Sequence, residues 1–254
     1  MFRKNRLQTR LAAGHHCRAA WLFTGSPDTA DIFGHAGYDA LIIDQEHSSY
    51  GIETAVHQMR AIRSAGQSTI LARLASNNLD QIKLLLDAGV EGLLLPTAES
   101  AEEVREFVAA CRYPPGGRRG AHFTVSRAAG WGNDMDRYYQ RVESELLLVA
   151  MIESEKGVRA ISGICGIEGI DMLFLGPLDL SGSIGKMGQW AAPEVQALTR
   201  EAESAALASG RLLGGALVPG ETAVDCFARG YRFVTVGSDV GILREGAFRS
   251  LQDN

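Results

Sequence analysis

Short apolar runs alternate with amphipathic stretches along the whole chain of 254 residues, and this alternation restricts the fold more than any other feature. Each run has four to seven residues and is apolar on both faces. Such a run is typical of a strand that is covered on two sides, as in a parallel sheet. The eight runs are residues 19–23, 40–43, 68–72, 92–95, 146–152, 172–175, 212–217 and 233–236.

Eight strands with helical crossovers predict an α/β fold, specifically a (β/α)8 TIM barrel. An open doubly wound sheet is the alternative, but no Gly-x-Gly-x-x-Gly follows the first strand, so its dinucleotide-binding version loses support. The chain has no evident linker, and its length suits one complete barrel, so we predict a single domain over residues 1–254. An extra N-terminal helix is expected over residues 5–13.

Some of the segments between the runs have a clear helical pattern, and one has no regular pattern. Residues 77–88 place their leucine and isoleucine side chains on one stripe and end at Gly89, which indicates a helix. Ser100 and Glu103 have capping-box spacing, so Glu103 is expected to reach back to the Ser100 amide. Residues 113–132 instead form a long stretch rich in Gly and Arg, which suits a lid, a subunit contact or a solvated loop.

Charge and cysteine usage exclude several classes of partner. Lys and Arg number 25 against 30 Asp and Glu, for a net charge of −5, so the basic excess that nucleic acid requires is missing. The longest apolar run, residues 146–152, is too short to span a membrane. Four scattered cysteines without a C-x-x-C pair indicate reduced thiols in a cytoplasmic protein. The first 27 residues are basic, as in a transit peptide, but their helical pattern is favoured.

Two carboxylates follow adjacent strands. In a barrel the reacting groups come from the C-terminal ends of the strands, and Glu153 and Asp179 lie at two such ends. Side by side, they would repel each other and resist ionisation unless a cation lay between them. Carboxylate oxygens suit Mg²⁺ or Mn²⁺. A divalent metal site is one interpretation, and two unrelated surface acids is the other.

Three further groups at this end of the barrel have suitable chemistry. His47 is the only histidine at a strand end, and its titration near neutrality suits proton transfer. Asp44, three residues earlier, or Asp87, placed against the dipole at the end of a helix, could orient it. Arg73 leaves the third strand and suits an oxyanion or carboxylate, or a salt bridge at the rim.

Lysine is scarce, and its positions exclude one mechanism. The four lysines are Lys4, Lys83, Lys156 and Lys186, and the pattern places none of them at a strand end. A Schiff-base aldolase needs a lysine in the mouth of the barrel. Metal-assisted chemistry is therefore favoured over imine chemistry.

Seven short motifs occur in a fixed order along nearly the whole chain. Together they resemble the HpcH/HpaI-type class II 2-keto-acid aldolases of the phosphoenolpyruvate/pyruvate barrel superfamily. The motifs are Ile43-Asp-Gln-Glu-His47, Leu71-Ala-Arg73, Leu86-Asp-Ala-Gly89, Tyr113-Pro-Pro-Gly-Gly-Arg-Arg-Gly120, Ile152-Glu153, Gly176-Pro-Leu-Asp-Leu-Ser181 and Val236-Gly-Ser-Asp239.

The resemblance implies a role for each candidate residue. Glu153 and Asp179 would hold the divalent metal, Mg²⁺ or Mn²⁺ with Co²⁺ as a further candidate, and the metal would chelate a 2-keto acid. His47 would be the general base, with its basicity raised by Asp87. Arg73 would stabilise the enolate. Backbone groups near Leu178 and Asp179 would contact the substrate carboxylate, and Asp44 and Glu46 would be supporting groups.

The implied reaction is reversible cleavage of a 4-hydroxy-2-oxo acid to pyruvate and an aldehyde through a metal-stabilised enolate. The family also implies a homo-oligomer, typically a hexamer built as a trimer of dimers, with the last helix exchanged between subunits. One position departs from the pattern: Met151 stands where the family often has a substrate-binding Gln, and a thioether cannot donate a hydrogen bond.

That departure keeps an alternative open, another metal–enolate lyase or decarboxylase acting on a 2-keto acid such as oxaloacetate. A phosphate-binding isomerase is a further alternative, suggested by Gly237-Ser-Asp239 near the eighth strand. A non-catalytic ligand-binding barrel is the last.

Overall fold

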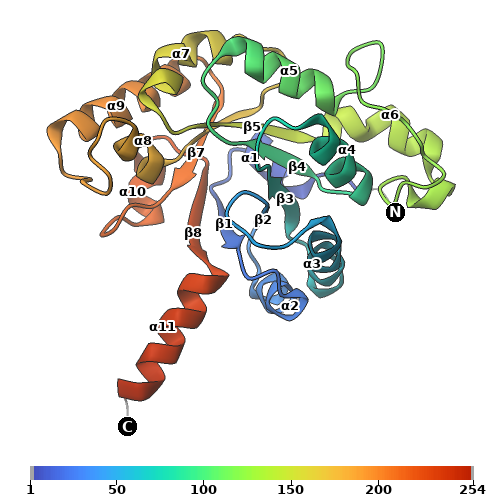
Figure 1. Ribbon diagram of the computed structural model, residues 1–254, viewed down its shortest axis with the longest axis horizontal. Helices are drawn as coiled ribbons and strands as arrows, with labels where there is room; N and C mark the ends of the chain where they lie inside the picture. The colour runs from blue at the N-terminus through green and yellow to red at the C-terminus, as the bar shows by residue number, and fades with distance from the viewer. Residues whose placement is uncertain (1–2, 253–254) are drawn as a thin grey trace.

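The computed structural model describes residues 3–252 and contains a closed barrel of eight parallel strands (Figure 1). Each strand pairs with the next in chain order, and the last pairs with the first, which confirms the predicted (β/α)8 barrel. The strands are β1 (Cys17–Leu22), β2 (Ala40–Asp44), β3 (Thr69–Arg73), β4 (Gly92–Leu95), β5 (Leu147–Ile152), β6 (Met172–Leu175), β7 (Leu212–Ala216) and β8 (Phe233–Ser238). The ends of β4 and β6 coincide with the predicted runs, and the other strand ends lie within two residues of them.

Helices join the strands and cover the outside of the barrel (Figure 1). The extra N-terminal helix is confirmed as α1. The helices are α1 (Arg6–Ala12), α2 (Pro27–Ala36), α3 (Ile52–Ala65), α4 (Leu79–Ala88), α5 (Ala101–Cys111), α6 (Met135–Glu145), α7 (Glu155–Cys165), α8 (Pro177–Ser183), α9 (Pro193–Ala208), α10 (Ala223–Ala228) and α11 (Asp239–Gln252), with one 3-10 turn, η1 (Gly130–Gly132).

The helix boundaries follow from local capping. Helix α4 ends at Gly89, whose φ of 100° lies in the left-handed region that favours glycine. Helix α5 begins after Ser100, whose hydroxyl accepts from the Glu103 amide at 3.1 Å. The other half of the expected capping box is wrong, because the Glu103 carboxylate accepts from the Glu99 amide at 3.1 Å and not from the Ser100 amide.

Two apolar clusters build the barrel, one inside the strands and one between strands and helices. The inner cluster takes alternate residues of each strand, including Ile42, Leu71 and Met151, because side chains along a strand point to opposite faces. Leu7 and Leu11 of α1 pack against the same cluster, so α1 closes the N-terminal end of the barrel. At the C-terminal end of the barrel, the next inward-pointing positions of the strands are taken by polar residues.

Residues 113–132 form the expected irregular segment, and it folds back on its own chain. Tyr113 and Ala129 pack with Tyr138 of α6 in a small separate apolar cluster. The Ala128 amide donates to the Asp87 carbonyl at 2.9 Å, at the C-terminal end of α4. Since helices run antiparallel to the strands, this end of α4 lies at the N-terminal end of the barrel. The segment therefore does not cover the strand ends of its own chain.

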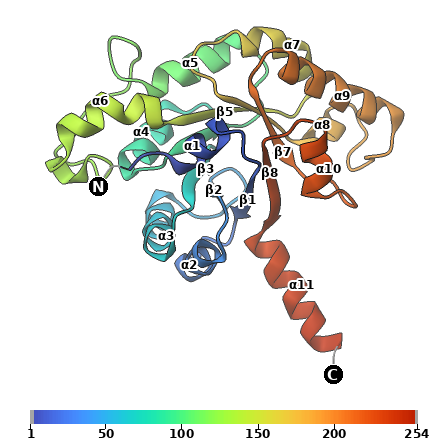
Figure 2. The same cartoon turned by 180° about the vertical axis from the view of Figure 1, so that it is seen from behind.

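Helix α11 projects away from the barrel instead of packing along it (Figures 1 and 2). Several of its apolar side chains are largely exposed, among them Phe248 at 63% and Leu251 at 77%. Among the described residues, no helix is long and apolar enough to cross a membrane.

Candidate active site

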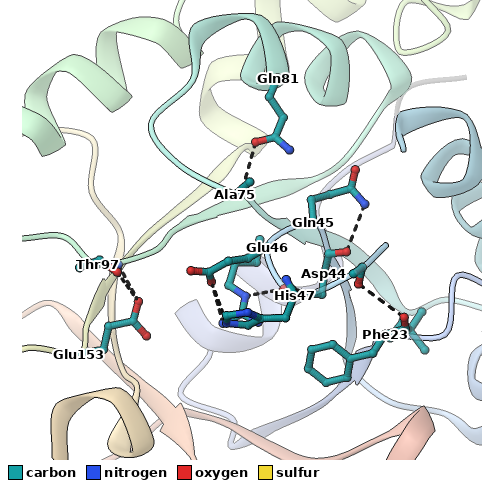
Figure 3. A network of polar contacts seen from close by, with 12 residues as sticks. Phe23, Asp44, Gln45, Glu46, His47, Ala75, Gln81, Thr97 and Glu153 are labelled. Atoms are coloured by element: carbon teal, nitrogen blue, oxygen red, sulfur yellow. Dashed lines mark hydrogen bonds and ion pairs between the residues drawn. The ribbon is translucent and has the colours of Figure 1, made fainter. Parts of the chain in front are cut away.

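The polar residues at the C-terminal end of the barrel form the next layer of inward-pointing side chains after the apolar interior. Asp44, Arg73 and Glu153 each lie two residues beyond an inward-pointing apolar residue, namely Ile42, Leu71 and Met151. The period of two in a strand therefore directs all three charged side chains inward. Figure 3 shows this end of the barrel, with Asp44, Glu46, His47 and Glu153 around one opening.

A fully buried carboxylate holds the arginine of the site. Asp44 and Arg73 are paired in register on neighbouring strands, and Arg73 Nε donates to Asp44 Oδ1 at 2.5 Å. Arg73 Nη1 lies 3.0 Å from Glu46 Oε2. The guanidinium carbon lies 4.6 Å from the centre of the Trp21 ring, an arrangement that stabilises a cation over an aromatic face. Arg73 is thus fixed by three neighbours, and it is only 6% exposed.

His47 is attached to this network through its backbone. Its amide donates to Asp44 Oδ2 at 2.7 Å, so one carboxylate orients both the histidine and the arginine. The imidazole is exposed, and its Nε2 lies 3.6 Å from Glu46 Oε2 (Figure 3). Burial raises the pKa of Glu46, while Arg73 and His47 oppose that rise. The predicted association of Asp44 with His47 is therefore present as a backbone contact.

Glu153 is buried, and one of its oxygens is already occupied. The Thr97 amide donates to Glu153 Oε1 at 2.6 Å, and the Thr97 hydroxyl lies 3.2 Å from the same oxygen (Figure 3). Thr97 adopts a φ of 46°, which is costly for a β-branched residue and is typical of functional sites. Burial raises the pKa of Glu153, and the charges of Glu46 and Asp179 raise it further against the Thr97 hydrogen bond.

Asp179 enters the site from the first turn of α8 and is exposed. The helix begins immediately after β6 because Pro177 occupies its first turn. Gly176 precedes that turn and lies against Glu153: a Cβ at this position would stand 2.4 Å from Glu153 Oε2. The absence of a side chain at Gly176 therefore lets the two carboxylates share one edge of the barrel.

Gly176→Ala should weaken cation binding and slow turnover by about tenfold or more, since overpacking of this kind costs roughly 1–3 kcal/mol. The added methyl group must displace the Glu153 carboxylate or α8. Titration with Mn²⁺ and steady-state rates measure the effect. Gly51→Ala is the matched control, because Gly51 has open space around its Cβ position and a φ of −93°. Unchanged Mn²⁺ affinity in Gly176→Ala would show that this close approach is not required.

Asp87 lies far from this group of residues, at the opposite end of the barrel. It belongs to the last turn of α4, five residues before β4 begins, and it accepts from Arg119 Nη2 at 2.7 Å. Arg119 is buried and also donates to the Tyr138 hydroxyl at 2.9 Å. No hydrogen bond or ion pair within residues 3–252 joins Asp87 to His47. The structure of one chain therefore does not bring together the pair that the sequence predicted.

The family model for HpcH/HpaI aldolase/citrate lyase matches residues 19–246, which include every strand-end residue described above. The chain belongs to this family.

Individual members of the HpcH/HpaI family resemble the chain over nearly its whole length. It is 34% identical over 239 residues to hydroxypyruvate/pyruvate aldolase from Roseobacter denitrificans, covering 94% of this chain and 93% of the relative. It is 35% identical over 235 residues to 2-keto-3-deoxy-L-rhamnonate aldolase from Escherichia coli K12, covering 92% and 87%. A crystal structure of a family protein from Burkholderia cenocepacia J2315 superposes with a TM-score of 0.91 at 32% identity, covering 98% of both chains.

Members of the HpcH/HpaI family depend on a divalent metal, and the donor set here fits one. Glu153 Oε2 accepts no hydrogen bond from any described residue. The charges of Asp179 and Glu46 lie close enough to raise the pKa of Glu153. Hard oxygen donors of this kind are the ligands of Mg²⁺ and Mn²⁺. Over residues 3–252, no group of three or more His, Cys, Asp or Glu side chains is gathered closely enough to hold an ion alone. Substrate and water oxygens would have to complete the coordination.

The remaining predicted contacts differ in accessibility. Leu178 is 50% exposed in the first turn of α8, where its backbone is open to a substrate. Met151, which replaces the Gln often found in the family, is 2% exposed and packs in the inner apolar cluster beneath Glu153. Its role as a substrate contact stays a prediction.

The carboxylate of Asp239 occupies the site at the start of α11, directly after β8. Asp239 is fully buried, and its oxygens accept from the backbone amides of Phe23, Thr24 and Val240 at 2.8–2.9 Å and from the Thr24 hydroxyl at 2.6 Å. A carboxylate therefore fills the position that a phosphate would need at the start of α11. This contact ties the residues just after β1 to the start of α11 and disfavours the phosphate-binding alternative.

Three contributors to the site were not anticipated. The Trp21 ring stacks against the Arg73 guanidinium, and the Thr97 amide donates to Glu153. Gly176 has no side chain and so leaves space for the Glu153 carboxylate. The inward alternation of the first strand was a usable signal for Trp21, and the motif at residues 176–181 was one for Gly176. Nothing in the sequence indicates the left-handed backbone of Thr97.

Proposed function

We propose that this protein is a metal-dependent aldolase that reversibly cleaves a 4-hydroxy-2-oxo acid to pyruvate and an aldehyde. One observation carries the proposal: a buried carboxylate with an uncommitted oxygen, a fixed arginine and an exposed histidine converge at the strand ends of a chain whose relatives include hydroxypyruvate/pyruvate aldolase. Glu153 and Asp179 would hold Mg²⁺ or Mn²⁺, which supplies Lewis acidity to the 2-oxo acid.

Each residue then has one task. His47, exposed at the opening, accepts the proton of the C4 hydroxyl, directly or through a water molecule. The C3–C4 bond breaks and the aldehyde leaves. The electron pair of that bond stays on the pyruvate fragment, which becomes the enolate. Arg73, held by Asp44 and Glu46, presents fixed positive charge to the developing oxyanion. Protonation at C3 yields pyruvate.

An imine route has no support from the positions of the lysines. Lys83 lies on α4 beside Asp80, Lys156 pairs with Glu99, and Lys186 lies 4.0 Å from Glu194. Lys4 lies near α1 at the N-terminal end of the barrel. In the described part of the chain, no lysine forms an ion pair with Asp44, Glu46 or Glu153, so none is held in the opening where an imine would form.

The aldolase and decarboxylase alternatives are separated by their products. With Mn²⁺, we expect pyruvate and hydroxypyruvate to be joined to short aldehydes, and the resulting hydroxy-oxo acids to be cleaved again, as followed by NMR. Oxaloacetate is the comparison substrate. Carbon dioxide release from oxaloacetate without any aldol product would assign the site to decarboxylation and reject the aldolase.

We further propose that the protein is a homo-oligomer in which Asp87 of one chain serves His47 of another. The two residues lie at opposite ends of their own barrel, so their predicted pairing requires a second copy. The exposed apolar side chains of α11, which extends from the barrel, offer a surface for such a copy (Figure 2). A hexamer is the assembly that the family implies.

Mixing two inactive variants tests this arrangement. His47→Ala and Asp87→Ala should each lose about 10²-fold or more of the rate. If the pair forms between chains, co-produced mixtures should recover activity in about one quarter of their sites, because an intact pair needs one chain of each kind. His47→Ala mixed with Glu153→Ala is the control and should not recover, since both residues serve the same barrel. A His47→Ala and Asp87→Ala mixture no more active than its parents would contradict the proposal.

A further inference from the structure

A cavity at the N-terminal end of the barrel is unused by the proposed reaction. Its volume is about 190 Å³, and it lies where α4, α6 and the segment before α6 meet the starts of β4 and β5. Figure 1 shows α4 and α6 side by side on this flank. The strand ends that carry Arg73 and Glu153 are at the other end of the same barrel, so within one chain the cavity is separate from the active site.

Three arginines line this cavity. Arg3 Nε is buried and donates no hydrogen bond to any of the described residues. Arg127 donates to the Ala88 carbonyl at 2.7 Å through Nη1 only, and burial together with nearby Arg60 lowers its pKa. Arg3 lies close enough to Glu91 to lower the pKa of that carboxyl, but no hydrogen bond joins these two side chains. Both guanidiniums thus retain donors without a hydrogen-bond partner, and guanidinium donors match a carboxylate in geometry.

The two acids in the lining are already engaged. Glu91 Oε2 accepts from the Ile70 amide at 2.9 Å, and its Oε1 lies 3.5 Å from Arg63. Burial raises the pKa of Glu91 to about 7, which makes it a weak competitor for the arginines. Glu145 Oε2 accepts from the Asn5 amide at 2.7 Å. With both acids ionised, three arginines leave a formal charge of one positive in the lining, and protonation of Glu91 makes the lining more positive, so it suits an anion.

The rest of the wall is apolar and partly aromatic. Trp131, Tyr138 and Val142 lie on one side, and Leu86 and Val90 on the other. Trp131 is 60% exposed and has a φ of 57°, so a large apolar side chain is held at the cavity in an unfavourable backbone conformation. A ligand with a short apolar body would cover part of this surface.

We propose that the cavity binds a small monocarboxylate whose carboxylate is held by Arg3 and Arg127 and whose apolar body lies against Trp131 and Val142. The ligand would bridge the segment before α6 to the end of α4, where Ala128 already bonds the Asp87 carbonyl. Occupancy therefore stabilises the folded chain, since a ligand that binds only the native state raises its stability.

Calorimetric titration with benzoate, in EDTA and in the Glu153→Gln background, tests the proposal without the metal site. We expect saturable binding and a raised Tm. Arg127→Gln and Arg3→Gln should each weaken binding by about tenfold, the equivalent of one charge-assisted hydrogen bond. Arg137→Gln, an exposed arginine of α6, is the matched control and should leave binding unchanged.

Three outcomes would overturn the proposal. One is the absence of saturable benzoate binding at millimolar concentration. Another is equal affinity in the wild type and both arginine variants. A third is tighter binding of inorganic phosphate than of benzoate, which would assign the cavity to a dianion. Because the titration uses metal-free protein, its failure leaves the aldolase proposal unaffected, and failure of the aldolase leaves this site unaffected.

Discussion

Glu153→Gln should lower the rate of pyruvate enolisation by about 10³-fold, because the loss of one anionic ligand removes several kcal/mol of electrostatic stabilisation. The replacement is nearly isosteric, and the Gln Oε1 can still accept from the Thr97 amide that now binds Glu153 at 2.6 Å. Folding should therefore be retained, and the defect should appear in cation affinity and in rate. Mn²⁺ titration and NMR-detected exchange of the pyruvate methyl protons measure the two.

Glu155→Gln is the matched control for this variant. Glu155 lies two residues further along, is about half exposed and pairs with Arg159 at the surface of α7. Its loss should change neither cation affinity nor rate, since exposed pairs of this kind contribute little. Retention of wild-type exchange in Glu153→Gln would show that this carboxylate does not hold the metal.

Arg73→Met should be the second large effect, and it should act on both rate and stability. Loss of the fixed positive charge should slow turnover by about 10²- to 10³-fold. Asp44 is fully buried, so without Arg73 its charge is uncompensated, and the free energy of unfolding should fall by about 3–5 kcal/mol.

A second substitution separates the two effects of Arg73. In Asp44→Asn/Arg73→Met the buried charge is removed with its partner, so much of the lost stability should return while the rate stays low. Denaturant unfolding and kcat measure the two quantities. Full activity in Arg73→Met, or equal instability of the single and double variants, would contradict the role assigned to this pair.

The barrel was predictable because its evidence is local and repeated. Eight apolar runs without a polar face can be buried only in a sheet covered on both sides, and the crossovers between them have helical spacing. Each strand end then follows from the same pattern to within one or two residues. The exchange predicted for the last helix stays a prediction, since a single chain shows only that α11 projects from the barrel.

The proximity of the candidate site residues was predictable where strand order determines it. Asp44 and Arg73 are neighbours in register, and Glu153 follows the same inward alternation, so position along the chain implies proximity. Asp87 shows the limit of this reasoning. A motif can single out a residue, but the end of a helix lies at the other end of the barrel from the end of a strand, and only the fold reveals that separation.

The exchange of pyruvate methyl protons for deuterium in D2O tests the central claim most directly. It needs neither the aldehyde nor the natural substrate, because it reports enolate formation alone. The wild-type protein with Mg²⁺ or Mn²⁺ should catalyse the exchange, EDTA should stop it, and restored metal should recover it. Exchange that persists in EDTA, or no exchange with any of a series of divalent metals, would contradict a metal-dependent enolate at Glu153, Asp179 and Arg73.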